Sequence, residues 1–261
     1  MLTVAEVADF LNVLAPPMLA ESWDNVGLLV GCHDRPVRRV MTCLTITPAS
    51  AQEAVAAGAD LIVSHHPLPF RPLKRLTSET SEGKLLLALI EAKICVFSPH
   101  TAFDSAQQGI NQRLAAGLQL VDIGPLVPGS ELGQGAGRYG RLSAPLRLAE
   151  LVERVKQLLG IDKIQAVGTL DQSLQSVAVA CGSAGEFLAP AKAAGCECLV
   201  TGEVRFHACL EAESLGMGLI LAGHFASERF AVEALSGILA QKFPALQVWA
   251  SQQERDPLHW L

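Results

Sequence analysis

Four histidines directly follow segments that have the pattern of buried strands, and two of them are followed four residues later by a carboxylate. The candidate residues are His65, His66, His100, Asp104, His224 and Glu228. In an open α/β sheet the functional crevice lies at the carboxyl ends of the strands, because loops and helix N-termini meet there. Imidazole and carboxylate groups together are ligands for divalent transition metals. The pattern therefore predicts a metal site.

The segments 100–104 and 224–228 share one spacing, a histidine followed four residues later by a carboxylate. Residues four apart face the same side of a helix, so each pair can point at one spot. The set exceeds what one tetrahedral ion needs, and a carboxylate can bridge two ions about 3.5–4 Å apart. We therefore expect two divalent cations. Zn, Fe, Mn, Co and Ni suit these ligands, whereas Mg and Ca usually prefer oxygen-only shells.

Taken alone, any one of these histidines could equally be a hydrogen-bonded core residue. The whole set is harder to explain in that way. Burying several imidazoles and two carboxylates at strand ends without a cation would leave polar groups unpaired, which is costly. The metal interpretation is favoured because it accounts for all of them.

An internal repeat supplies the elements that position these residues. The first copy predicts strands at 40–45, 61–64 and 94–98 and a glycine-terminated helix at 48–58. The second copy predicts strands at 177–181, 198–201 and 219–222 and a helix at 186–195. Alternating strands and helices indicate βαβ units and largely parallel sheets. The expected fold is α/β, with two similar lobes from a duplication and the metal site in the cleft between them.

The lobe boundary is expected in a segment rich in glycine and proline, residues 124–140, read as the crossing between lobes. This places the first lobe at 1–124 and the second at 125–261, with the C-terminal segment packing back on the first lobe. Before the first repeat, Thr3 and Glu6 form a capping-box pattern that predicts an N-terminal amphipathic helix.

Composition narrows the class of protein. The chain has 261 residues, half of them apolar, and a net charge of −6 without a long Lys/Arg run, which argues against nucleic-acid binding. Seven scattered cysteines do not form the pattern of a secreted disulfide framework, so a reducing cytoplasm is expected. No export signal is visible. Apolar stretches end before the roughly 18 residues of a membrane span, so no membrane partner is expected.

Five segments together resemble the NIF3-like family, also called GTP cyclohydrolase 1 type 2 homologs. They are Ser-Trp-Asp-Asn-Val-Gly at 22–27, Leu-Ile-Val-Ser-His-His-Pro at 61–67, His-Thr-Ala-Phe-Asp at 100–104, Thr-Gly-Glu at 201–203 and Gly-His-Phe-Ala-Ser-Glu at 223–228. The resemblance implies two α/β lobes and a hexameric ring. It implies the metal ligands His65, His66, Asp104, His224 and Glu228. His100 would then be a catalytic group that supports the ligands or handles protons.

The resemblance also implies a function. The expected activity is metal-dependent hydrolysis of a small molecule, a nucleotide or related heterocycle, and the family name points to opening of the guanine ring of GTP. The alternative is a non-catalytic metal-binding or adaptor protein that acts through protein interactions. Many members have Asp at the position of Thr45 and Asn-Leu at Ala102-Phe103, so a substrate contact at these positions would differ here.

Some motifs have two interpretations. Cys196, Cys198, His207 and Cys209 resemble a zinc ligand set, but buried structural cysteines are the simpler interpretation. The loop at 181–185 is either an anion-binding helix N-terminus or a tight turn.

Other segments bear on the expected site. Residues 23–25 either line the metal crevice or form a buried turn, and residues 67–79 form either a lid or an oligomer contact. Glu203 occupies the repeat position that corresponds to the ligand histidines of the first copy, so it is expected to hydrogen-bond a ligand histidine.

Overall fold

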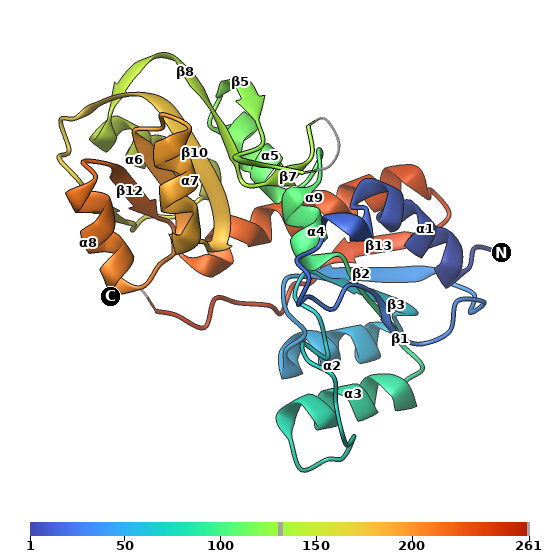
Figure 1. Cartoon of the computed structure of the whole chain (residues 1–261). Helices are drawn as coiled ribbons and strands as arrows, with labels where there is room; N and C mark the ends of the chain where they lie inside the picture. Colours follow the sequence, from blue (N-terminus) through green and yellow to red (C-terminus); the bar gives the residue numbers. More distant parts are fainter. Residues whose placement is uncertain (130–132, 260–261) are drawn as a thin grey trace. The chain divides into compact units, whose positions relative to one another are not determined.

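The computed structural model describes residues 1–129 and 133–259. Its contacts define two compact units (Figure 1). Unit 1 comprises Met1–Phe103 and Ala231–Pro257, and unit 2 comprises Asp104–Phe230 and the chain end from Leu258. The internal repeat predicted two lobes, residues 1–124 and 125–261, and those lobes stay a prediction. The two units are defined by packing instead, and their bounds differ.

Unit 1 contains a five-stranded sheet in the order β1-β4-β3-β2-β13. Its strands are β1 (Gly27–Val30), β2 (Arg39–Cys43), β3 (Leu61–Ser64), β4 (Cys95–Ser98) and β13 (Gln247–Ala250). Strands β13, β2, β3 and β4 are parallel, and β1 is antiparallel to β4. The expected parallel βαβ pattern is therefore present, and the C-terminal strand β13 extends it.

Helices cover both faces of this sheet. They are α1 (Val4–Leu14), α2 (Pro48–Ala57), α3 (Ser81–Glu91) and the last part of α9 (His224–Lys242), with a short 3-10 turn η1 (Pro17–Leu19). Met41 and Cys43 of β2 pack in the core that α2 and α3 help to form. The hydroxyl of Thr42, between them on the opposite face, donates to the carbonyl of Val232 in α9. This alternation follows from the two-residue period of a strand.

The ends of two helices match the sequence signals. The backbone N–H of Thr3 donates to the Glu6 carboxylate over 2.8 Å, which completes the predicted capping box of α1. Helix α2 ends at Gly58, which adopts a left-handed conformation with φ of 62°. Glycine reaches this region without the steric cost that other residues have, which explains why the helix stops there.

Unit 2 contains a six-stranded mixed sheet in the order β5-β8-β10-β11-β12-β9. Its strands are β5 (Val121–Gly124), β8 (Arg138–Arg147), β9 (Gln165–Val167), β10 (Ser173–Ser183), β11 (Cys198–Glu203) and β12 (Gly218–Leu221). Only β10, β11 and β12 are parallel. The expectation of a largely parallel sheet is wrong for this unit, because segments outside the repeat add antiparallel strands at both sides.

The segment expected to cross between lobes belongs to unit 2. It contains the end of β5, the small hairpin β6 (Val127–Pro128) and β7 (Gly135–Ala136), and the start of β8. Residues 130–132 of this segment lie outside the described residues. Glycine is needed in this hairpin because its strands approach closely. A Cβ at Gly135 would meet the backbone of Val127.

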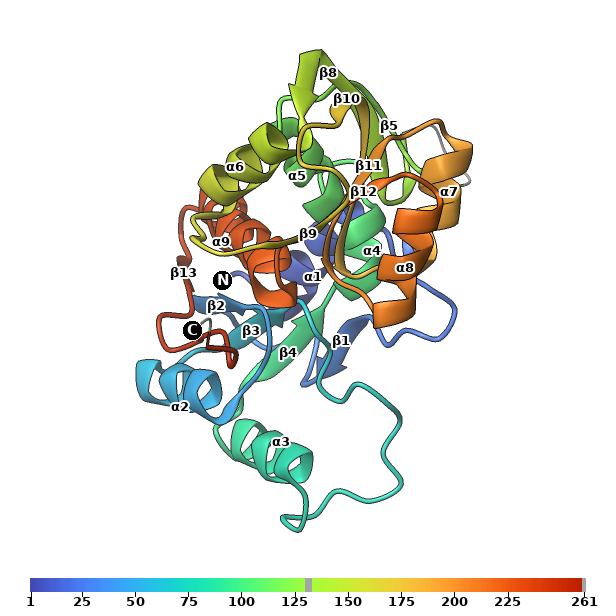
Figure 2. The same cartoon turned by 90° about the vertical axis from the view of Figure 1, so that its left-hand side faces the viewer.

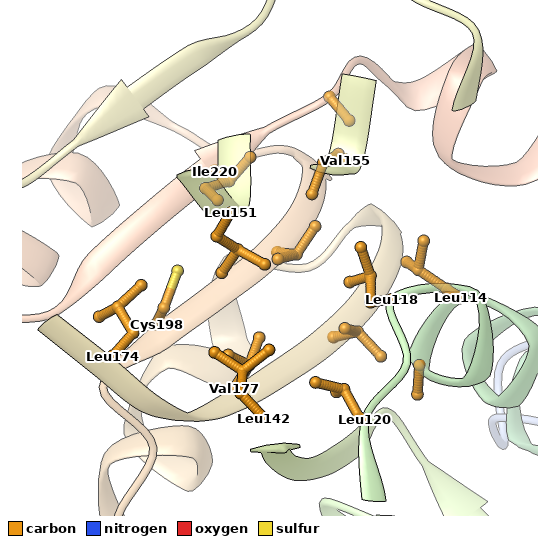
Figure 3. Packing of buried hydrophobic residues seen from close by; sticks show 14 of the residues in the cluster. Leu114, Leu118, Leu120, Leu142, Leu151, Val155, Leu174, Val177, Cys198 and Ile220 are labelled. Carbon is orange, nitrogen blue, oxygen red and sulfur yellow. The ribbon is translucent and has the colours of Figure 1, made fainter. Parts of the chain in front are cut away.

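Two pairs of helices cover the faces of the unit 2 sheet (Figure 2). Helices α5 (Ile110–Gly117) and α6 (Leu148–Leu159) cover one face, and α7 (Leu188–Ala193), the turn η2 (Gly185–Phe187) and α8 (Phe206–Ser214) cover the other. Leu114 of α5 and Leu151 of α6 belong to the same buried cluster as Val177 and Ile220 of the sheet (Figure 3). Apolar burial of this kind contributes about 25 cal/mol per Å² to folding.

The candidate histidines follow the strand ends, as predicted. His65 comes directly after β3, and α4 (His100–Ser105) and α9 begin at His100 and His224, shortly after β4 and β12. Among the described residues, no helix is long and apolar enough to cross a bilayer.

Candidate metal-binding site

Unit 1 gathers three of the candidate residues in one cluster. The imidazole centroids of His65 and His66 lie 5.1 Å apart, and that of His100 lies 5.2 Å and 5.6 Å from them. One nitrogen from each ring lies within 4.8 Å of the others. His65 and His100 are buried, and His66 is half-buried. The strand ends therefore bring together nitrogen donors that are far apart in the sequence.

His66 is in hydrogen-bond contact with Thr45. The hydroxyl oxygen of Thr45 lies 2.7 Å from Nδ1 of His66. Thr45 itself is held by Glu254, whose carboxylate accepts hydrogen bonds from the backbone N–H groups of Leu44 and Thr45. Thr45 thus contacts the side chain of a candidate ligand. Ala102 and Phe103, the other departure from the family pattern, are buried.

His100 is paired with a buried carboxylate. Its Nδ1 lies 2.7 Å from Oδ1 of Asp24, and the backbone N–H and the hydroxyl of Thr101 donate to Oδ2. Burial raises the pKa of Asp24, but the hydrogen bonds from His100 and Thr101 outweigh it and lower the pKa to about 2. Asp24 is therefore ionised at neutral pH, so its Oδ1 accepts a hydrogen bond from Nδ1 of His100.

Unit 2 places His224 between two carboxylates. Its Nδ1 lies 3.1 Å from Oε1 of Glu203, and its Nε2 lies 3.1 Å from Oε2 of Glu228. The hydrogen bond to Glu228 is the main reason that the pKa of His224 rises to about 9, and Glu203 adds to it against the opposing effect of burial. The bond expected between Glu203 and a candidate ligand histidine is present. His224 and Glu228, four residues apart on α9, also lie on the same side of the helix, as predicted from their spacing.

Both the carboxylate and the backbone carbonyl of Asp104 accept hydrogen bonds. The Cys181 thiol donates to Oδ1 of Asp104 over 3.2 Å, and the Asn111 side-chain amide donates to the Asp104 carbonyl over 3.2 Å. The oxygen of the same amide accepts the N–H of Cys181 over 2.7 Å. Burial raises the pKa of Cys181 well above its usual value, and the nearby charges of Asp104 and Glu228 raise it further. Unit 2 thus brings both candidate carboxylates near one protonated thiol.

The glycine loop at 181–185 is a tight turn that supports Glu228. Gly182 has a φ of 65°, and a Cβ there would meet Oε1 of Glu228. The N–H of Gly182 donates to the Ser227 hydroxyl, and the N–H of Ala184 donates to the Glu203 carbonyl. The N–H of Cys181 donates to the side-chain oxygen of Asn111, so each of these three amides has a hydrogen-bond partner within the protein. The anion-binding alternative for this loop stays a prediction.

A buried arginine supports the helix that carries Asp104. Arg138 is fully buried and donates to the carbonyls of Ser105 and Ala106, at the C-terminal end of α4, over 3.1 Å and 2.8 Å. It also donates to the Gln112 side chain and to carbonyls of the β6–β7 hairpin region. Burial lowers the pKa of Arg138 to about 10, so its charge persists at neutral pH.

The cysteine-rich zinc alternative is wrong. Cys196 packs in the core on the α7 face of the sheet and Cys198 in the core on the α6 face. Among the described residues, the groupings that could hold a metal contain no cysteine. These side chains therefore serve packing, as the simpler interpretation held.

Sequence reasoning missed several supporting residues. Asp24 belongs to the segment 23–25, for which the sequence predicts either a buried turn or a place in the crevice, and its hydrogen bond to His100 puts it beside the histidine cluster. Cys181 and Arg138 contact Asp104 and α4 from far along the chain, and Asn111, seven residues after Asp104, belongs to no spacing pattern that indicates a ligand. Only the packing of unit 2 reveals them.

A family model described as Duf34/NIF3 (NGG1p interacting factor 3) matches residues 2–257. The chain is 37% identical over 229 residues to a Helicobacter pylori protein named GTP cyclohydrolase 1 type 2, covering 88% of each chain. It is 32% identical to NIF3-like protein 1 of Drosophila melanogaster, covering 98% of this chain and 88% of the relative.

The fold is also similar to that of a solved structure. A Bacillus cereus protein described as related to NIF3 superposes with a TM-score of 0.89 at 23% identity. The match covers 100% of this chain and 99% of the other. The mixed α/β architecture is thus one that solved relatives share.

Proposed function

Because this chain belongs to the Duf34/NIF3 family, we propose that it binds two divalent cations and hydrolyses a nucleotide or related heterocycle. The observation that carries the proposal is the cluster of His65, His66 and His100, whose nitrogens lie within 4.8 Å of one another. Unit 2 supports it independently, because His224 there meets the carboxylate of Glu228. Both groups of side chains are of the kinds that bind transition metals.

The proposed ligands are His65 and His66 from unit 1 and Asp104, His224 and Glu228 from unit 2. The donor set of imidazole nitrogens and carboxylate oxygens fits Fe, Zn, Mn, Co or Ni. Such cations, when bound, polarise substrate oxygens and favour ionisation of water near neutral pH. The hydrogen bonds between Thr45 and Nδ1 of His66 and between Nδ1 of His224 and the Glu203 carboxylate, which accepts, are of the supporting kind that orients ligand imidazoles.

His100 is proposed as the catalytic residue that moves protons. The ionised Asp24 holds the Nδ1 proton of His100, so Nε2 is the atom that accepts a proton from water or returns it to the leaving group. Burial of the pair keeps the imidazole in one orientation. Asp24 acts through His100 and is a positioning residue.

The proposed substrate is GTP, whose guanine ring would be opened. This rests on the name of the Helicobacter pylori relative, GTP cyclohydrolase 1 type 2. We also propose that the chain assembles into a homohexamer and acts in the cytoplasm, in line with the family resemblance. Mass photometry of the purified chain would test the assembly, and a mass of one or two subunits would contradict it.

Metal content per subunit is the decisive measurement for the site. Protein purified without chelators or a histidine tag is analysed for metals as wild type, His66→Ala and Glu228→Ala. About two ions in the wild type and a loss in both variants would support His66 and Glu228 as metal ligands. His33→Ala, which removes an exposed histidine, is the matched control. No stoichiometric metal under metal-replete conditions would overturn the site.

Turnover separates the enzyme from the alternative adaptor. Wild type is incubated with GTP and added Mn, Fe or Zn, and the loss of guanine absorbance is followed. Turnover that disappears in His66→Ala and Glu228→Ala supports hydrolysis. Stoichiometric metal with unchanged GTP at every metal would remove GTP as the substrate and favour the non-catalytic, protein-binding role.

A further inference from the structure

We propose that Trp23 and Phe70 form an aromatic platform that stacks the planar ring of a nucleotide beside His100. The inference rests on the proposed function and deepens it, because it names the surface that binds the heterocycle. It also gives a role to two large apolar side chains that lie at the surface of unit 1.

The platform is contiguous with the histidine cluster. The ring centroids of Trp23 and Phe70 lie 6.0 Å apart at a tilt of 40°. Each centroid also lies 6.0 Å from that of His100, with the rings nearly perpendicular at 75° and 72°. A planar ring that covers the two aromatic faces would therefore lie next to the group proposed to move protons.

Both aromatic side chains are open to solvent. Trp23 is 61% exposed and Phe70 is 44% exposed, although aromatic rings of this size usually bury most of their surface. An exposed pair at the edge of a polar cluster is typical of a binding surface. Bases stack on such pairs because every base has a π-face.

The backbone that carries the platform is held in place. Beside Trp23, the carboxylate of Asp24 accepts hydrogen bonds from His100 and Thr101. The side-chain amide of Asn25 donates to the carbonyl of Pro69 over 2.8 Å, which ties the Trp23 turn to the residue before Phe70. Preorganised rings lose little conformational freedom on binding, which favours a ligand site over an incidental exposure.

The charge of the adjoining loop fits the phosphates of a nucleotide. The chain has a net charge of −6, yet the exposed residues Arg71, Lys74 and Arg75 follow Phe70 within six positions. A base on the platform would place its anionic tail near this loop. An uncharged heterocycle would form no ion pair with these basic side chains, whereas the phosphates of a nucleotide would. A nucleoside phosphate is therefore the ligand class that the surface fits best.

Binding of GTP and of inorganic tripolyphosphate to the metal-loaded full chain tests the platform. Calorimetry is performed at low temperature on wild type, Trp23→Leu, Phe70→Leu and Trp23→Phe. We expect each leucine variant to weaken GTP binding about 10- to 100-fold while tripolyphosphate binding changes less than about twofold. Trp23→Phe should retain most of the affinity. Phe206→Leu, which removes a 71% exposed ring of α8, is the matched control.

The outcomes distinguish the platform from the proposed function. Unchanged GTP affinity in both leucine variants, or equal loss of GTP and tripolyphosphate, would overturn the platform. A change of subunit number in Trp23→Leu with unchanged GTP affinity would also overturn it, since the pair would then serve a second copy of the chain. If the variants lose GTP affinity as expected but wild type never hydrolyses GTP, the platform stands and the proposed reaction fails.

Discussion

Nδ1 of His100 lies 2.7 Å from Oδ1 of Asp24, whose side chain is fully buried. Asp24→Asn should lower kcat about 10- to 100-fold and leave the metal content unchanged, because an amide no longer fixes the Nδ1 proton. Nitrogen-15 NMR of the imidazole should show a shift towards the Nε2–H tautomer. His100→Gln should lower kcat at least as far, and the double variant should lose no more than His100→Gln alone. A wild-type kcat in Asp24→Asn would contradict the pairing.

Thr45→Val should weaken metal binding about 10- to 100-fold, since it removes the hydroxyl that lies 2.7 Å from Nδ1 of His66. Thr45→Ser keeps the hydroxyl and should bind metal like the wild type. Competition with a fluorescent chelator measures both affinities. Equal affinities in the two variants would show that the Thr45 hydroxyl does not orient His66.

His224 should titrate with a pKa of about 9 in the metal-free protein, because Glu228 and Glu203 stabilise its charged form. The folded pKa is raised above the usual 6.5, so this contribution to stability is fully present below about pH 6.5 and is lost as the pH rises through about 9. Metal binding at pH 7.5 should therefore release about one proton from this residue, measurable by calorimetry in two buffers.

The control for this titration is His224→Gln. Its melting temperature without metal should change less between pH 6.5 and pH 9.5 than that of the wild type. An NMR titration midpoint of the wild-type imidazole near 6.5 would contradict the ion pairs with Glu203 and Glu228.

Gly182→Ala should destabilise the protein and reduce metal binding, because the new methyl group would meet Oε1 of Glu228 and displace it. Gly195→Ala is the matched control. Gly195 also has a positive φ, 76°, but its Cβ would meet nothing within 4 Å. Both variants should lose about 1 kcal/mol of stability from backbone strain, and only Gly182→Ala should also lose metal. Retained metal in Gly182→Ala would show that Glu228 tolerates the displacement.

Arg138→Met should lower the free energy of unfolding by about 3 kcal/mol, because it leaves buried carbonyls of Ser105 and Ala106 without their donor. Arg141→Met on the same strand removes an exposed arginine and should change stability by less than about 0.5 kcal/mol. Urea denaturation measures both. Similar losses in the two variants would contradict the role of Arg138 at the end of α4.

Local signals predicted much of the fold. Glycine ended α2 at Gly58 because few other residues adopt a left-handed backbone cheaply, and continuous apolar runs located β3 and β12 because parallel strands are buried on both faces. The antiparallel strands β5, β8 and β9 escaped prediction. Their hydrophobic patterns are short or interrupted, and their pairing depends on partners far along the chain.

By itself the sequence determined which residues follow the central strands, and hence that His65, His66, His100 and His224 lie at strand ends. It also determined the pairing of His224 with Glu228, because four residues make about one helical turn. Only the tertiary structure decided that Asp24 holds His100, that Cys181 holds Asp104, and that Trp23 lies against Phe70. Strand ends and helix turns follow from local chain geometry, whereas hydrogen bonds and ring contacts across dozens of residues follow from packing.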